Sequence, residues 1–178
     1  FVRGEKDIPL TEFRSRHSSA TEAIGYGKTL MLFHMLRTQL GDDQFKSALR
    51  EFYKSNAFKR ASFEDVKRSF AAAAQTSLDA DFDPWVKRPG APELRLADVK
   101  VDSADGGYTV RFALEQTQSD APFAVDLPVA IHLQGVETAH QTRVRLVDKR
   151  GEFGVRVSAP PTRLDVDPEF DVFRRLDR

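Results

Sequence analysis

The sequence contains no cysteine. This absence excludes disulfide bonds, zinc sites built from thiolates and a cysteine nucleophile, because each of these needs a sulfur atom. It leaves the cellular compartment open, since a lack of disulfides is weak evidence for a reducing environment.

An excess of charge of one sign and a long apolar run are missing as well. Lysine and arginine together number 27, as do aspartate and glutamate, so the formal net charge is zero. This balance removes the positive field that proteins normally use to bind nucleic acids or anionic lipids. The longest apolar stretch, residues 30–33, is followed by His34 and is far shorter than the ~20 residues of a membrane-spanning helix. We therefore expect no nucleic-acid partner and no membrane span.

The chain begins at Phe1, without an initiator methionine and without a basic and then apolar leader. We interpret it as a piece of a longer polypeptide. Its 178 residues, of which 40% are hydrophobic and 30% charged, are enough to bury a core in one ordinary domain or two small ones. At this length the chain itself is no large multi-domain enzyme.

Apolar residues recur at helical spacing in the first half of the chain. The pattern predicts four helices: Thr21–Leu40, Asp43–Ser55, one that starts after Ser62, and a short one at Leu78–Val86. Ser19 and Glu22 form a capping-box pattern. Gly25 and Gly27 are poor helix formers, so we expect regular helix only from about Tyr26. The other expected caps are Gly41, Asp42 and Ser62.

Pro89, Gly90 and Pro92 then end the helical pattern, because proline cannot continue a helix and glycine permits a sharp turn. Beyond them apolar residues alternate with a period of two, which predicts strands. Six are expected: Leu94–Val101, Tyr108–Glu115, Phe123–Leu133, Thr142–Asp148, Phe153–Val157 and Leu164–Val166. Pro128 falls on the polar face of the third strand, which predicts a sheet edge or a bend there.

These patterns predict an α+β fold in two modules. Residues 1–90 form an N-terminal helical bundle, and residues 91–178 form an antiparallel, immunoglobulin-like β-sandwich. Phe82 and Trp85 lie on one side of the last helix and are expected to pack beneath the turn at residues 89–92.

Short motifs yield no complete active site. Residues 27–29 match the end of a phosphate-binding loop, but the first glycine of that pattern falls on Glu22, whose carboxylate would repel phosphate. The acidic stretches 79–83 and 165–171 lack the glycine and the final glutamate of a calcium loop, and we interpret both as solvated turns. The histidines are too scattered for two to share a helix face, as zinc sites often require. They are His17, His34, His132 and His140.

Residues 26–36, followed by residues 40–45, resemble the aminopeptidase N family of zinc metallopeptidases, which are gluzincins. That family has Y-x-K-G, then an apolar helix, then L-G-x-x-x-F. Its tail has the form F-x-x-W-x-x-x-P-G-x-P. This tail is formed here by Phe82, Trp85, Pro89, Gly90 and Pro92. In between, the likeness is carried by Leu49, Tyr53, Phe63, Asp65, Phe70 and Leu78. It covers about residues 24–96, and the remainder matches only as the kind of β-sandwich that follows the catalytic domain.

The resemblance implies the last helices of a catalytic domain followed by that β-sandwich. In the family, zinc held by H-E-x-x-H and a downstream glutamate activates water to attack the N-terminal peptide bond, and the tyrosine of Y-x-K-G stabilises the oxyanion. The resemblance therefore assigns a catalytic role to Tyr26, and it assigns no metal, cofactor or substrate-binding residue. Without it, Tyr26 is better read as a helix-start aromatic that packs with a bonded hydroxyl.

Two departures from the family pattern matter. Thr29 replaces the glycine of Y-x-K-G, and H-E-x-x-H occurs nowhere in the chain. We therefore expect the zinc ligands on a missing N-terminal portion, which together with a peptide substrate is the expected partner. This chain alone is expected to bind no zinc and to be inactive. Lys28 either orients the substrate or the tyrosine loop, or it makes a surface salt bridge. The alternative function is a non-catalytic scaffold or protein-interaction module from a protein without a working zinc site.

Overall fold

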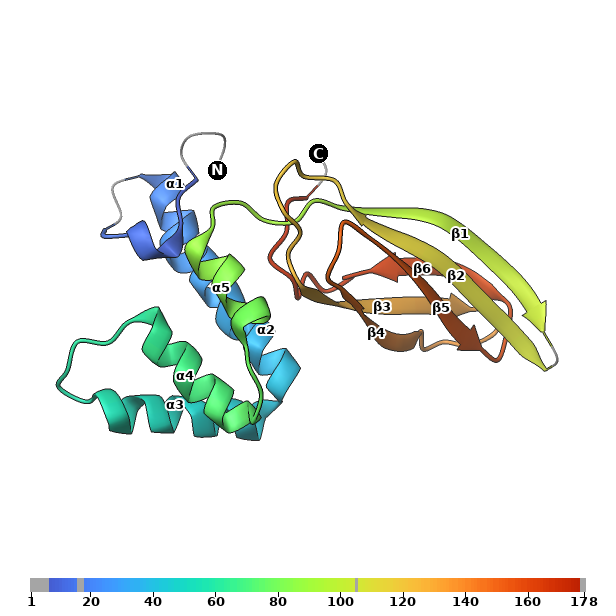
Figure 1. The fold of residues 1–178 in the computed structure, drawn as a ribbon. Coiled ribbons are helices and arrows are strands. Elements are labelled where there is room, and N and C mark those ends of the chain that lie inside the picture. Colours follow the sequence, from blue (N-terminus) through green and yellow to red (C-terminus); the bar gives the residue numbers. More distant parts are fainter. Residues whose placement is uncertain (1–6, 16–17, 105, 177–178) are drawn as a thin grey trace. The chain divides into compact units, whose positions relative to one another are not determined.

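The computed structural model describes residues 7–15, 18–104 and 106–176. The chain separates into two compact units, Phe1–Gly90 and Ala91–Arg178. Helices make up the first unit and strands the second (Figure 1), so the chain has an α+β fold. Within the described ranges, no helix is long and apolar enough to cross a bilayer. The assignment of the units to a peptidase catalytic domain and its following sandwich stays a prediction.

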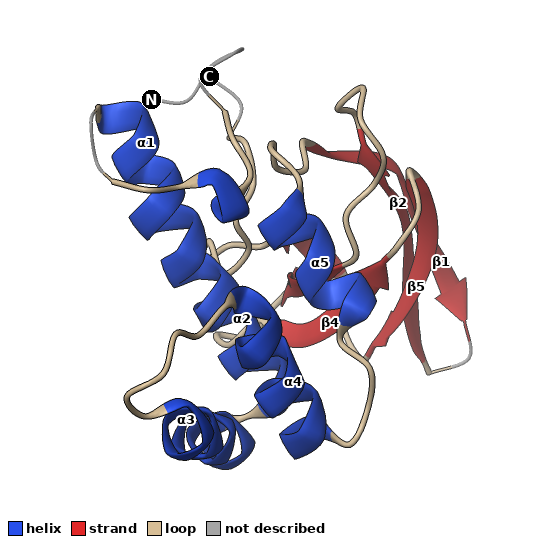
Figure 2. Cartoon of the chain, turned by 60° about the vertical axis from the view of Figure 1, so that its left-hand side comes forward, coloured by secondary structure: helices blue, strands red, loops and turns tan. Residues whose placement is uncertain are grey.

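In the first unit, whose helices are blue in Figure 2, short helical elements come first and longer helices follow. Its elements are η2 (Leu10–Glu12), α1 (Ser19–Glu22), the π-helix η3 (Ala23–Lys28), α2 (Thr29–Leu40), α3 (Asp42–Asn56), α4 (Phe63–Ala74) and α5 (Asp79–Lys87). The four predicted helices are present, with shifted ends.

The first helix begins earlier than predicted and with a different cap. Ser18, not Ser19, is the N-cap, and its hydroxyl accepts a hydrogen bond from the Thr21 amide at 3.2 Å. The Thr21 hydroxyl in turn accepts from the Ser18 amide at 3.0 Å, so threonine replaces the expected glutamate in the capping box. Regular α-helix resumes at Thr29, close to the predicted Tyr26, but the residues before it are helical too, because α1 and the π-helix carry the helical run through the two glycines.

Gly41 separates α2 from α3 with a single residue. It follows α2 as expected, but its φ of 79° and ψ of 164° lie outside the left-handed helical region. Asp42 is the first residue of α3 and not its cap. It instead pairs with Arg37, whose Nε lies 2.6 Å from its Oδ1. The cap at Ser62 is confirmed, since its hydroxyl accepts from the Asp65 amide.

Phenylalanine rings form the core between α2, α3 and α4. Phe33, Phe45 and Phe70 meet edge to face, with centroid distances between 5.4 and 6.4 Å. Phe70 is fully buried, and burying an aromatic ring of this size contributes a few kcal/mol. Phe82 and Trp85 of α5 are buried too, each with 1% of its surface exposed.

The second unit contains two three-stranded antiparallel sheets. Their strands are β1 (Leu94–Ala104), β2 (Gly107–Gln116), β3 (Val125–Leu133), β4 (His140–Leu146), β5 (Arg150–Val157) and β6 (Pro161–Val166). The strand orders are β1-β2-β5 and β4-β3-β6. The large buried side chains of β2 and β3 alternate along each strand, and Ala113 and Ala130 between them are buried as well. The large side chains supply the core of this unit: Val110, Phe112, Leu114, Val125, Leu127, Val129 and Ile131. An immunoglobulin-like sandwich stays a prediction for this arrangement.

The third strand differs from the prediction at its start and at its proline. Phe123 precedes β3, because its amide and carbonyl are both hydrogen-bonded by the Gln116 side chain, at 2.9 and 2.8 Å. Pro128 lies in the central strand of its sheet and not at an edge. The Pro128 carbonyl accepts a hydrogen bond from the Asp167 amide, just past the end of β6. The Pro128 nitrogen, which has no hydrogen to donate, faces the same side, where β6 has ended and no strand carbonyl is left without a donor.

A buried ion pair organises the segment after β6. The Asp167 side chain is fully buried and accepts a hydrogen bond from Arg174 Nε at 2.7 Å. The same carboxylate accepts from the Asp171 amide at 2.7 Å. The interpretation of residues 165–171 as a solvated turn is therefore wrong at Asp167, because Arg174 and two backbone amides replace water around its carboxylate.

Candidate functional site

The π-helix η3 interrupts the run of helix from Ser19 to Leu40 at the place where the sequence holds Gly25, Tyr26, Gly27 and Lys28. A single π-turn within α-helix is uncommon and occurs often at functional sites. It displaces the side chains of its turn from the ordinary helical register. The residues singled out by the family resemblance therefore lie on locally distorted backbone.

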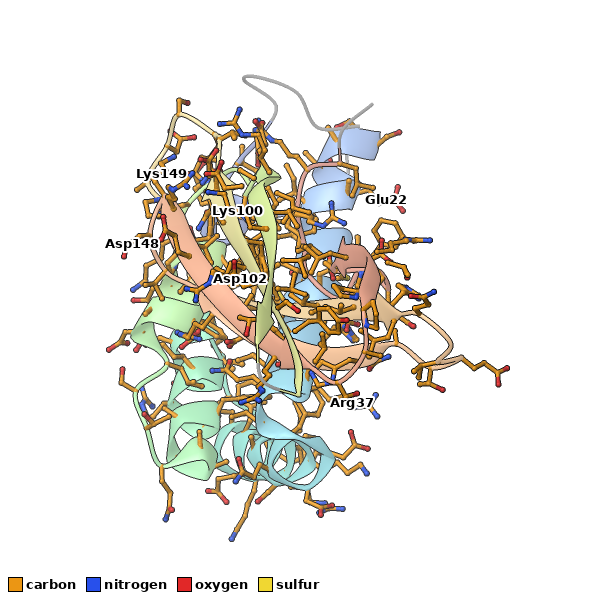
Figure 3. The ribbon with its side chains drawn as sticks, turned by 90° about the vertical axis from the view of Figure 1, so that its right-hand side faces the viewer. Glu22, Arg37, Lys100, Asp102, Asp148 and Lys149 are labelled. Carbon is orange, nitrogen blue, oxygen red and sulfur yellow. The ribbon has the colours of Figure 1, made fainter. Side chains whose placement is uncertain are left out.

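Tyr26 lies on the solvent face of this helical run, with 58% of its surface exposed. Glu22, one turn earlier, is exposed on the same run and projects outward in Figure 3. The Tyr26 ring packs edge to face against Phe13, with 5.8 Å between centroids and 76° between planes. Among the described residues none hydrogen-bonds the Tyr26 hydroxyl, so the phenol is accessible as a donor.

Lys28 is the last residue of the π-helix and is buried, with 1% of its surface exposed. Its Nζ donates hydrogen bonds to the carbonyl of Arg88 at 2.8 Å and to the carbonyl of Gly90 at 3.2 Å. The Gly90 amide donates to Asp7 Oδ2 at 2.9 Å. The lysine thus ties the π-helix to the end of α5, and the surface salt bridge considered for it is wrong.

Burial lowers the pKa of Lys28 from 10.5 to about 8. The negative charge of Asp7 opposes this shift, and the positive charge of Arg88 adds to it. Two backbone carbonyls solvate an ammonium less well than water does, which is why burial dominates. Lys28 is accordingly a structural anchor of the Tyr26 turn and does not reach solvent.

Residues 27–29 do not form the loop of a phosphate-binding motif. They lie inside a helical run and not in a loop, and the Lys28 ammonium donates its hydrogen bonds to backbone carbonyls. The neighbouring Thr29 is the first residue of α2, where it continues the helix.

The acidic stretch at residues 79–83 belongs to α5 and not to a solvated turn. Lys67 of α4 donates to Asp79 Oδ1 at 2.6 Å and to Asp83 Oδ1 at 3.0 Å. Glu64 Oε1 lies 3.2 Å from the same Nζ. Lys67 is 9% exposed, so the carboxylates compensate a buried charge and fasten α5 to α4.

The described residues provide no group of three or more histidine, cysteine, aspartate and glutamate side chains suited to a metal ion. His132 lies 3.0 Å from Asp165 in the β unit, without a further ligand of that kind. His17 lies outside the described residues. A zinc site does not fit the part of the chain that the structure describes.

A hollow of about 390 Å³ lies beside η2 in the helical unit. It is lined by apolar side chains that include Leu10, Phe13, Phe63 and Val86. Tyr26 is not part of its wall, so the hollow does not place a ligand against the phenol.

Sequence reasoning missed the partner of Tyr26. Phe13 belongs to an irregular segment with no periodic signal, so nothing in the pattern pointed to it. Gly25 did carry a signal, because a glycine inside a helical pattern often marks a close approach of another group. The sequence does not show which group approaches.

Three proteins that are similar to this chain are aminopeptidases: two are similar in sequence and one in fold. The chain is 30% identical to aminopeptidase N of Lactococcus lactis subsp. lactis over 70 residues, which is 39% of this chain and 8% of that protein. It is 25% identical to aminopeptidase N of Haemophilus influenzae over 150 residues, or 84% of this chain and 15% of that protein. Its fold resembles Legionella pneumophila aminopeptidase A, solved in complex with aspartic acid, with a TM-score of 0.67 and 18% identity over 91% of this chain and 18% of that one.

No family model matches the chain. The chain spans only 8 to 15% of the length of the two curated relatives described. It is therefore similar to one portion of aminopeptidases, in sequence over part of its length and in fold over nearly all of it.

Proposed function

We propose that the chain is a portion of a zinc aminopeptidase that hydrolyses N-terminal peptide bonds. It would contribute the last helices of the catalytic domain, with Tyr26 as the oxyanion-stabilising residue, and an immunoglobulin-like β-sandwich. The similarity to aminopeptidase N supports the reaction class, and the exposed phenol of Tyr26 on an anchored π-turn is the observation that carries the residue assignment.

The chemistry of the phenol suits this role. Attack on a peptide carbonyl puts negative charge on its oxygen, and a hydrogen-bond donor aimed at that oxygen lowers the barrier. The Tyr26 hydroxyl is solvent-accessible, and a neutral phenol donates without having to ionise. The buried Lys28 holds the backbone that carries Tyr26, so the donor starts from a fixed position.

Zinc in the longer protein would polarise the carbonyl or activate water. The described residues supply no ligand set for it, so its ligands are proposed to lie in another portion of that protein. Its partners are then a peptide substrate and this other portion of the catalytic domain.

The test is to read the coding sequence upstream of Phe1 and to assay the longer protein. An H-E-x-x-H motif with a later glutamate, one zinc per chain by elemental analysis, and hydrolysis of an aminoacyl-arylamide are the expected results. The 178-residue chain, assayed in parallel, should release no arylamine. A longer protein without the motif, the zinc and the activity would instead support a scaffold or protein-interaction module.

A further inference from the structure

We infer that Phe13 is a positioning residue for Tyr26, and that Gly25 exists at its position to let the Phe13 ring dock. This inference rests on the proposed function of Tyr26. Phe13 lies just after η2, thirteen residues before the tyrosine that it contacts.

Gly25 gives the Phe13 ring a bare stretch of backbone to lie against. A Cβ atom built on Gly25 would lie 2.3 Å from Phe13 Cε2, 2.4 Å from Cζ and 2.5 Å from Cδ2. Carbon atoms in contact prefer about 3.5 to 4.0 Å, so no side chain fits there. The backbone of Gly25 is helical and does not need glycine for a positive φ. The glycine is therefore required for space, and the space is filled by Phe13.

The backbone that carries the Phe13 ring is held by the short helix that precedes it. The Phe13 amide donates to the Leu10 carbonyl at 3.2 Å, and Leu10 is buried with 3% of its surface exposed. Arg14 Nη1 donates to the carbonyl of Thr11 at 2.7 Å and to that of Phe13 at 3.1 Å. These contacts fix the backbone of Phe13, and the ring itself lies against Gly25.

The Tyr26 ring packs against the Phe13 ring. The two rings meet edge to face at 5.8 Å, within the favoured range for aromatic pairs. Because no described residue hydrogen-bonds its hydroxyl and 58% of the residue is exposed, the contact with Phe13 is what restrains the direction of the phenol. A donor that must meet a developing oxyanion at hydrogen-bond distance needs such a restraint, since small misplacements reduce the rate strongly.

The catalytic test is a double-mutant cycle in the longer protein, with Phe13→Leu, Tyr26→Phe and both together. We expect Phe13→Leu to lower kcat on the order of 10-fold with little change in KM, because the donor remains but is less well directed. In the Tyr26→Phe background the same change should have no further effect, since there is no hydroxyl left to direct. Phe13→Tyr, which keeps the ring, should retain most of the activity.

The outcomes separate this inference from the proposed function. A drop in kcat for Tyr26→Phe, together with either no effect of Phe13→Leu or an equal effect in both backgrounds, overturns the positioning role alone. An unchanged kcat for Tyr26→Phe overturns the catalytic assignment and the positioning role with it.

The docking itself is tested without catalysis, by thermal unfolding of Gly25→Ala, Phe13→Ala and the double variant. Gly25→Ala should lower Tm by several degrees when Phe13 is present. When Phe13 is already alanine, the same change should leave Tm unchanged or raise it, since alanine is a better helix former. An equal loss in both backgrounds would show that the Phe13 ring does not occupy the space above Gly25.

Discussion

The buried lysine beneath the Tyr26 turn gives the structure a pH dependence that can be measured. The perturbation is Lys28→Met, which keeps the length and apolar stem of the side chain and removes the ammonium. In the wild type this group donates to the carbonyls of Arg88 and Gly90 and is almost without solvent contact. The quantity of interest is the difference in the free energy of unfolding between the wild type and the variant.

The magnitude follows from the lowered pKa of Lys28. A pKa that falls from 10.5 to about 8 on folding means that the folded state disfavours the charged form by about 3 kcal/mol. Below pH 8 the lysine is charged in both states, and this penalty is present in full. Between pH 8 and 10.5 the unfolded state binds more protons than the folded state, so stability rises with pH by up to about 1.4 kcal/mol per pH unit. The methionine variant lacks this pH dependence.

Trp85 provides the assay. It is the only tryptophan in the sequence and is buried in the helical unit, so its fluorescence follows the unfolding of that unit in denaturant. Measured at several values between pH 7 and 10, the stability of the wild type should increase relative to Lys28→Met by about 2.5 kcal/mol in total. Lys87→Met is the matched control, because the Lys87 side chain is 54% exposed. A difference that stays flat or falls with rising pH would show that Lys28 is not buried as a charged donor.

Three further expectations concern stability. Trp85→Ala should reduce the free energy of unfolding by about 3 to 5 kcal/mol by circular dichroism, since the ring is buried, and a loss under about 1 kcal/mol would contradict that burial. Asp167→Asn should cost about 3 kcal/mol in the β unit because it leaves Arg174 without its charge partner, and Arg174→Met in the same background should recover part of the loss. Hydrogen bonding from Lys67 lowers the pKa of Asp79 below 3.8, so the stabilisation by this pair is present above that pH and is lost as pH falls below it. Acid titration should therefore destabilise the wild type more steeply than Lys67→Met.

Most secondary-structure elements were predictable because they follow from local periodicity. The apolar spacing of helices and the alternation in strands reflect which face of each element is buried, and both can be seen within a few residues. The Ser62 cap is equally local, since it joins residues three positions apart. The start of β3 was less predictable, because the amide and the carbonyl of Phe123 are hydrogen-bonded by the Gln116 side chain and not by a neighbouring strand.

The failures arise where a distant group decides the outcome. Pro128 was expected at a sheet edge or a bend, and the strand order rules out the edge by placing β3 in the centre of its sheet. The proline is tolerated there because its nitrogen faces the end of β6, where no strand residue pairs with it. Lys28 is buried by carbonyls sixty residues away, which no local pattern reveals. The docking of Phe13 on Gly25 is of the same kind, since it depends on where an irregular segment returns to the helix.

The central claim is that Tyr26 is a hydrogen-bond donor to the oxyanion in a zinc aminopeptidase. The most direct measurement is kcat for Tyr26→Phe in the longer protein with an aminoacyl-arylamide substrate. Because this change removes only a hydroxyl and the ring stays packed against Phe13, folding and KM should change little, whereas kcat should fall about 10²- to 10³-fold. An undiminished kcat would contradict the claim and leave Tyr26 as a packing residue of the helical unit.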